Sequence, residues 1–185
     1  MASMNVQAWF MGDSDADQRE EHHCNPPEYV DEEYIGKHGI KFWKVNPDDY
    51  ENDATYNKVR ADRGYNYDDE ITITKEKLPN YEEKIKKFFE EHLHLDEEIR
   101  FCLDGSGYFD FRDFKERWVR MKFTKGLFFV LPAGIYHRFT LDTNNYVKAK
   151  RLFVGEPVWT PYNRPADEKP QRATFLESIK HLTED

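Results

Sequence analysis

Six short β-rich runs lie between residues 92 and 153, and this series constrains the fold of the chain more than any other feature. The runs cover residues 99–103, 108–112, 118–123, 127–131, 135–141 and 146–153. Turn-forming residues separate them, for example Asp104-Gly105-Ser106-Gly107 and Pro132-Ala133-Gly134. Strands at such close spacing predict a barrel or a sandwich of two sheets.

The segments on either side of these runs are expected to pack around them. Residues 81–89 carry apolar side chains on one side of a predicted helix and charged side chains on the other. A chain of 185 residues is long enough for one sizeable core. We therefore predict one mainly β domain of the α+β class, with peripheral helices. Residues 1–91 supply outer strands and helices, residues 92–160 form the barrel core, and residues 161–185 form a tail with a short helix.

Charge and cysteine usage argue against several classes of protein. Lys and Arg number 27 against 36 Asp and Glu, which gives a formal net charge of -9. An acidic chain binds phosphate backbones poorly, so we expect no nucleic-acid partner. We also expect no signal peptide and no membrane insertion, because no apolar run is long enough to span a bilayer. Cys24 and Cys102 offer no disulfide framework, so we predict a cytoplasmic location, with the nucleus as a second compartment.

Three histidines and one glutamate are the strongest candidates for a chemical site. His92 and His94 are two residues apart and would share one face of a strand, and Glu98 follows them. His137 shares its face of a later run with apolar residues, which places it inside the barrel. A mixed nitrogen and oxygen set suits a six-coordinate, redox-capable divalent metal better than a closed tetrahedral zinc site. Taken singly, His137 could be a buried core histidine, and residues 92–98 a solvated acidic turn.

Taken together, the two segments resemble the two halves of the cupin motif. The first half is His92-x-His94-x-x-x-Glu98 followed by Gly105, and the second is Gly126 followed by Pro132-x-Gly134-x-x-His137. Lys86 and Leu141 stand where the broad pattern often has Gly and Asn, but all four ligand positions are intact. The resemblance implies a cupin fold, a jelly-roll-like β-barrel, across the single domain.

Longer strings narrow the resemblance to one family. They cover residues 91–100, 103–110, 131–140, 151–159 and 162–164, and residues 6–9 and 78–85 fit as well. These strings resemble the acireductone dioxygenases of the methionine salvage pathway, in particular the eukaryotic form. The resemblance fades only at residues 11–28 and after about residue 167.

This resemblance implies a metal-dependent dioxygenase. Members cleave 1,2-dihydroxy-3-keto-5-methylthiopentene with O2. The Fe(II) form yields 4-methylthio-2-oxobutanoate and formate, and the Ni(II) form yields 3-methylthiopropionate, formate and carbon monoxide. The family ligands match His92, His94, Glu98 and His137, so we expect one Fe(II), or alternatively Ni(II), per monomer. The expected partners are the acireductone substrate and O2, and we expect the chain to be a monomer.

Arg100 is the candidate for charge compensation in the reaction. Strand parity points it inward beside Glu98, and an inward guanidinium needs an anionic partner. A bound enediolate would supply that partner, so Arg100 is both a catalytic and a substrate-binding candidate. The alternative is an ion pair with a carboxylate such as Glu91 or Glu97. These two glutamates are in turn candidates for orienting a ligand imidazole.

Two aromatic residues complete the predicted site. Phe139 and Trp159 resemble family positions that line the pocket, where they would bind the methylthio tail of the substrate. Plain core packing is the alternative for both. Elsewhere, His22-His23-Cys24 lies in a polar loop and is not expected to bind metal, and His38 and His181 lie at predicted helix ends and are expected to be solvated. Gly105-x-Gly107 is expected to form a hairpin turn.

Two other functions remain open from the sequence. One is another metal-dependent cupin oxygenase, oxidase or isomerase, such as a manganese oxalate oxidase, because these enzymes share the ligand types. Arg100 and residues 151–159 favour the dioxygenase. The other is a non-catalytic interaction protein on a cupin scaffold, which an intact ligand set disfavours.

Overall fold

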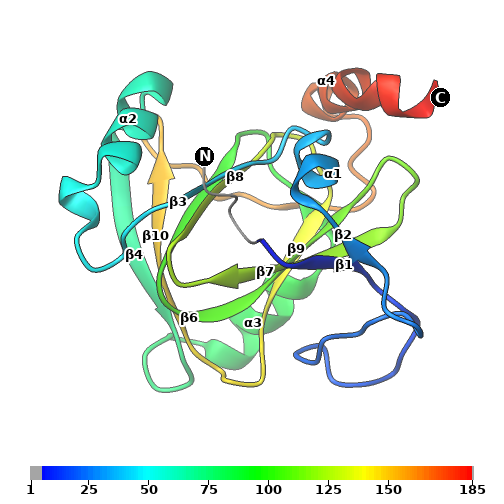
Figure 1. The fold of residues 1–185 in the computed structure, drawn as a ribbon, viewed down its shortest axis with the longest axis horizontal. Helices are drawn as coiled ribbons and strands as arrows, with labels where there is room; N and C mark the ends of the chain where they lie inside the picture. Colours follow the sequence, from blue (N-terminus) through cyan, green and yellow to red (C-terminus); the bar gives the residue numbers. More distant parts are fainter. Residues whose placement is uncertain (1–5, 185) are drawn as a thin grey trace.

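Two antiparallel sheets enclose a common core and share one long strand (Figure 1). The structure is a computed structural model that describes residues 6–184. Its strands are β1 (Ala8–Phe10), β2 (Tyr29–Val30), β3 (Lys41–Lys44), β4 (Tyr67–Ile73), β5 (His92–Leu93), β6 (Glu98–Arg112), β7 (Trp118–Thr124), β8 (Leu127–Leu131), β9 (His137–Leu141), β10 (Val147–Phe153) and β11 (Tyr162–Asn163). The first sheet has the order β2-β1-β7-β6-β9-β5-β11. The second has the order β4-β10-β6-β8-β3.

Strand β6 belongs to both sheets, which contradicts the expected hairpin turn at Gly105-x-Gly107. Its first half pairs with β8 and β10, and its second half, from Ser106, pairs with β7 and β9. The register against β10 shifts near Lys148, and Gly105 has a φ of 74°. A side chain at Gly105 would clash with the carbonyl oxygen of Tyr146. Glycine therefore permits a bend that carries one strand from sheet to sheet, instead of a turn that ends it.

The helices cover the outside of the sheets. They are α1 (Glu32–Gly36), α2 (Ala54–Arg63), α3 (Tyr81–Phe89) and α4 (Pro170–Ile179), with 3-10 turns at Tyr50–Asn52 and Lys180–Thr183. Helix α2 is capped at its start by Asp53, whose side chain accepts a hydrogen bond from the Tyr56 amide, and at its end by left-handed Gly64. In Figure 1 helix α2 lies at the upper left beside β4 and β10, and α3 lies at the bottom of the view. Helix α3 packs against β9. Among residues 6–184, no helix is both long and apolar enough to cross a membrane.

Alternate residues of β6 pack into two different cores, as strand parity predicts. Ile99, Phe101 and Leu103 pack outward with Tyr56 of α2 and its neighbours. Cys102, one residue from Phe101, points the other way into the core between the sheets, with Phe109 and Phe129. Burying a ring such as Phe101, which is fully buried, contributes about 1.5–3 kcal/mol. The inner face of β6 is therefore fixed by the burial of its outer face.

Strand β1 does not lie at the edge of its sheet, because it pairs with β7 on one side and with the short strand β2 on the other. One local expectation from the sequence is wrong. His38 is not solvated: it is fully buried, its Nδ1 lies 3.0 Å from the Tyr34 carbonyl oxygen, and its Nε2 accepts a hydrogen bond from the Phe114 amide. The neutral His38 ring therefore links helix α1 to the turn between β6 and β7 through these two contacts. Exposed His181 is placed as expected.

Candidate metal centre

Four side chains from three strands and one connection converge at one end of the barrel. His92 of β5 lies directly opposite His137 of β9, His94 follows β5, and Glu98 begins β6. One ligand atom from each of the four residues lies within 4.8 Å of the others. The imidazole ring centroids are 4.5 Å apart for His92 and His137, and 4.9 Å apart for His92 and His94. The structure thus brings together the whole quartet identified in the sequence.

Backbone carbonyl oxygens hold the three imidazoles in one orientation. The Nδ1 atoms of His92, His94 and His137 lie 2.6, 2.9 and 2.9 Å from the carbonyl oxygens of Glu90, Thr160 and Ile135. Each Nδ1 must then carry the proton, so each Nε2 is free to bind a metal. The carbonyl of Thr160 belongs to the connection after β10, so residues distant in sequence set the direction of the His94 ring.

Glu91 and Glu97, the carboxylates expected to orient the imidazoles, have other partners. Glu91 accepts hydrogen bonds from Arg112 and Arg164. Glu97 accepts hydrogen bonds from Arg63, the last residue of α2, and from Tyr65, which follows that helix. Both glutamates sit next to ligand positions, but their side chains are drawn away by arginines. The orienting contacts to the imidazoles come from the backbone instead.

Burial and neighbouring charges set the protonation states that a metal needs. Burial, reinforced by the other imidazoles, lowers the pKa of His92 to about 3, and burial also lowers the pKa of His94. Burial alone would raise the pKa of Glu98, but Arg100 and His137 outweigh it and hold that pKa well below its usual range. Neutral imidazoles and an ionised carboxylate at neutral pH are the forms that bind a cation.

The donor set fits a divalent ion. Two donors about 2.1 Å from one ion lie at most about 4.2 Å apart, so the quartet needs only a slight contraction. His137 Nε2 already lies 2.5 Å from Glu98 Oε2, and His94 Nε2 lies 3.5 Å from the same oxygen. Three nitrogens and one oxygen leave two positions of an octahedron for other ligands.

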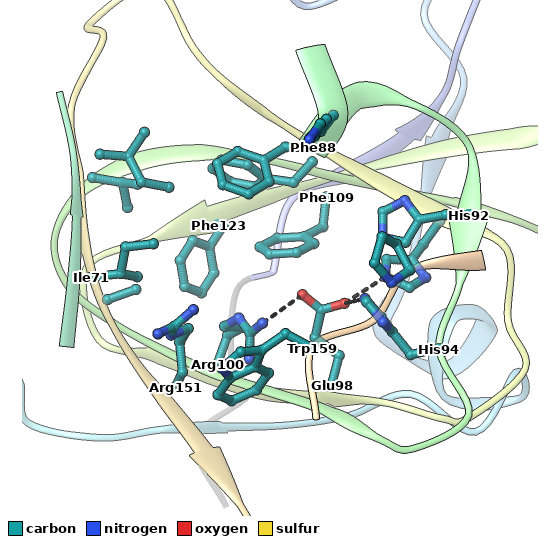
Figure 2. A pocket seen from close by; sticks show the side chains of 17 residues that line it. Ile71, Phe88, His92, His94, Glu98, Arg100, Phe109, Phe123, Arg151 and Trp159 are labelled. Atoms are coloured by element: carbon teal, nitrogen blue, oxygen red, sulfur yellow. Dashed lines mark hydrogen bonds and ion pairs between the residues drawn. The ribbon is translucent and has the colours of Figure 1, made fainter. Parts of the chain in front are cut away.

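Arg100 lies on the other side of the Glu98 carboxylate from the imidazoles, as Figure 2 shows. Its guanidinium is 3.2 Å from Glu98 Oε1, and its side chain is 14% exposed. The ion pair expected as the alternative, with Glu91 or Glu97, is not the one that forms. Arg100 also lies over the Trp159 ring at 5.2 Å, and Arg151 lies over the same ring at 4.6 Å. Burial lowers the pKa of Arg100, and the neighbouring Glu98 opposes that shift.

A cavity of about 240 Å³ opens beside the quartet and is mostly apolar (Figure 2). Phe139 and Trp159, both predicted to line the pocket, do so. The sequence reasoning did not identify other lining residues, including Ile71, Phe88, Phe109, Phe123 and Arg151. Arg151 could have been found by parity, because it alternates with the pocket residues Val147 and Ala149 along β10. The remaining residues come from four separate elements, so no local pattern identifies them.

The motif His22-His23-Cys24 does not join this centre. The His23 ring stacks on Trp9 at 4.2 Å, and its Nε2 lies 3.1 Å from a carboxylate oxygen of Glu21. Among residues 6–184, the quartet at the barrel end is the group of His, Cys, Asp and Glu side chains close enough to share an ion.

Known proteins resemble this chain over nearly its whole length. Residues 7–161 match the model of the ARD/ARD' family. A protein of Ixodes scapularis named acireductone dioxygenase is 60% identical over 177 residues, which cover 95% of this chain and 97% of that protein. Acireductone dioxygenase 4 of Arabidopsis thaliana is 56% identical, covering 96% of this chain and 95% of that protein. The Branchiostoma floridae protein of the same name is 59% identical, covering 94% of this chain and 97% of that protein.

A solved structure resembles the fold. It is described as acireductone dioxygenase from Bacillus anthracis with a cadmium ion in its active centre. The superposition has a TM-score of 0.66 at 23% identity, and it covers 86% of this chain and 99% of that chain. At this identity the likeness concerns the fold alone. It confirms the prediction of a mainly β cupin fold.

Proposed function

The chain belongs to the ARD/ARD' family, and from this membership we propose how its residues carry out the acireductone dioxygenase reaction of methionine salvage. Relatives that match more than nine-tenths of the chain carry that activity in their names. The protein is therefore a metal-dependent dioxygenase, an oxidoreductase that uses O2. The alternatives of a cupin isomerase and of a purely non-catalytic interaction protein do not fit these relatives.

We propose that His92, His94, Glu98 and His137 bind one divalent ion per chain. The observation that carries this proposal is the convergence of their ligand atoms within 4.8 Å at the end of the cavity. Fe(II) is the proposed resident metal, with 4-methylthio-2-oxobutanoate and formate as products. Ni(II) accepts the same donors, and would direct the reaction to 3-methylthiopropionate, formate and carbon monoxide. When bound, the ion supplies a Lewis acid and a template that orients the enediol and O2.

Arg100 would compensate the charge of the substrate. The enediolate form of the acireductone is an anion, and Arg100 is the guanidinium that lies against the quartet. Its Glu98 partner would then be shared with the cation, which leaves the guanidinium free to face the substrate oxygens. Trp159, whose ring contacts both Arg100 and Arg151, would keep the guanidinium planes from turning toward solvent.

The apolar wall of the cavity would bind the methylthio tail. Phe139 is 9% exposed, and its ring lies 4.8 Å from Phe109 and 6.1 Å from Phe88. Rings at these distances leave a dry, polarisable surface that suits a thioether. Excluding water from this side also strengthens the electrostatic interaction between Arg100 and the substrate anion.

We further propose that residues 1–185 form a single cupin domain that acts as a monomer in the cytoplasm. The small-molecule substrate and O2 are then its only required partners. The shared core of residues from both sheets supports the single domain.

The decisive experiment compares His92→Ala with His181→Ala, since His181 is exposed and lies outside the cavity. Metal content by mass spectrometry, O2 uptake and product identity would be measured for both proteins and for the wild type. His92→Ala should lose bound metal and turnover, whereas His181→Ala should keep both. Wild-type metal content in His92→Ala would refute the ligand assignment. Iron in the wild-type protein from its native cells would support the Fe(II) form, and nickel would refute it.

A further inference from the structure

A second groove lies on the other side of strand β9 from the metal centre. It has a volume of about 470 Å³ and shares no lining residue with the catalytic cavity. Neighbouring residues in the sequence face different sites: His137 and Phe88 line the catalytic cavity, whereas the next residues, Arg138 and Phe89, line the groove. The outer wall of the groove is formed by residues of the 11–22 loop. This groove is therefore a separate feature of the chain.

Three arginines line this groove, although the chain as a whole carries a net charge of -9. They are Arg112, Arg117 and Arg138, and among residues 6–184 the one carboxylate that lines the groove with them is the exposed Asp13. Aromatic rings hold the guanidiniums in place. Arg112 and Arg138 each lie 4.0 Å from the Trp118 ring, and Arg138 also lies 4.2 Å from the Phe89 ring.

The buried carboxylate beneath the groove is shared between two cations. Asp110, 1% exposed, receives two hydrogen bonds from fully buried Arg120 and one, at 2.8 Å, from Arg138 Nε. One negative charge thus serves two guanidiniums, and Arg138 is the one that reaches the groove. Burial lowers the pKa of Arg138, and the positive charges of Arg120 and Arg112 lower it further. The cluster of Asp110, Arg120 and Arg138 therefore carries one net positive charge.

Hydrogen-bond donors also remain available. Within residues 6–184, Arg138 Nη1 and Arg117 Nη1 donate to no acceptor, while the other nitrogens of these two side chains are engaged by Asp110, Asp113, Met11 and Tyr34. The Arg120 guanidinium donates instead to the carbonyl oxygens of Gln18 and Glu20, which fixes the loop that closes the groove. The donors are therefore oriented before any ligand arrives.

We propose that this groove is a binding site for a small oxyanion, a phosphate or carboxylate group held by Arg138 and Arg117. Planar guanidiniums match such groups because two N–H donors can meet two oxygens at once. The ligand would supply the negative charge that Asp110 cannot give to both of its arginines.

The chain carries its own reporters for a test. Trp118 lines the groove and Trp159 lines the catalytic cavity. Metal-loaded, 15N-labelled protein would be titrated with inorganic phosphate and, separately, with acetate at constant ionic strength, following the indole N–H signals. The Trp118 signal should shift saturably while the Trp159 signal stays in place. The anion with the lower Kd identifies whether the site takes a phosphate or a carboxylate group.

Arg138→Gln should weaken binding about tenfold or more, because it removes a charged hydrogen-bond donor while Asp110 keeps Arg120. Arg117→Gln, in which a 45% exposed side chain is replaced, is the second variant if Arg138→Gln does not fold. Lys58→Gln, on exposed α2, removes the same charge outside the groove and should leave Kd unchanged. A Trp118 signal that does not shift, a shift of Trp159 alone, or equal affinity in the variants would overturn the proposal.

Discussion

Replacing Arg100 with Gln should lower turnover while leaving the metal in place. The guanidinium is 14% exposed, lies 3.2 Å from Glu98, and lines the cavity beside the quartet. Its loss removes a charged hydrogen-bond donor to the bound enediolate, a contribution of about 1.5–3 kcal/mol. That range corresponds to a roughly 10- to 150-fold lower kcat/KM. Arg100→Lys keeps the charge but not the planar guanidinium over Trp159, so its kcat/KM should lie between those of the wild type and Arg100→Gln.

The assay is O2 uptake with the acireductone substrate, together with metal content for every variant. Arg60→Gln is the matched control, because Arg60 also lies over an aromatic ring, Tyr56 at 5.6 Å, but does not line the cavity. Its turnover should stay within about twofold of the wild type, since surface substitutions change little. If Arg100→Gln keeps both metal and wild-type kcat/KM, Arg100 has a structural role and the charge-compensation argument fails.

Two further predictions concern stability. Gly134→Ala should destabilise the protein by more than about 1–2 kcal/mol, because Gly134 has a φ of 84° and a Cβ there would clash with the Gln171 carbonyl oxygen. Gly36→Ala, with open space around it, should instead stabilise by about 0.4–1 kcal/mol, and denaturant unfolding of the pair measures the contrast. Burial lowers the pKa of His38, so below about pH 6.5 the unfolded state binds more protons than the folded state, and stability decreases as the pH falls. His38→Gln should remove up to about 1.4 kcal/mol per pH unit of that loss in unfolding titrations between pH 7.5 and 5.5, and parallel curves for variant and wild type would contradict the assignment.

The candidate metal-binding quartet could be identified in the sequence because the spacing within each half of its motif is local. His92 and His94 lie two residues apart, and the face of β9 that carries His137 is otherwise apolar. If the strands belong to one barrel, the two halves of the motif come together, and no further assumption is needed to form the site. The position of Arg100 followed from the same parity, because Ile99 and Phe101 must pack outward against α2. Side chains alternate between the two faces of a strand, so the inward directions of His137 and Arg100 could be inferred from the sequence.

Other features depended on contacts that no local pattern records. Glu91 and Glu97 seemed placed to orient the imidazoles, but arginines at positions 63, 112 and 164 compete for them. Gly105 resembled a turn residue, yet the neighbouring Tyr146 backbone makes it a bend within β6. His38 looked like a helix end and became a buried connector, because the turn after β6 folds over it.

The sequence by itself determined the mainly β architecture, the four candidate metal ligands and the inward direction of Arg100, because strand periodicity and ligand type are properties of short segments. Only the tertiary structure decided which carbonyls aim the imidazoles, which rings form the apolar wall, and which arginines surround the second groove. Those features join residues far apart in the chain, and their energies come from burial and from competition between charges. Such competition is settled only when all partners are in place.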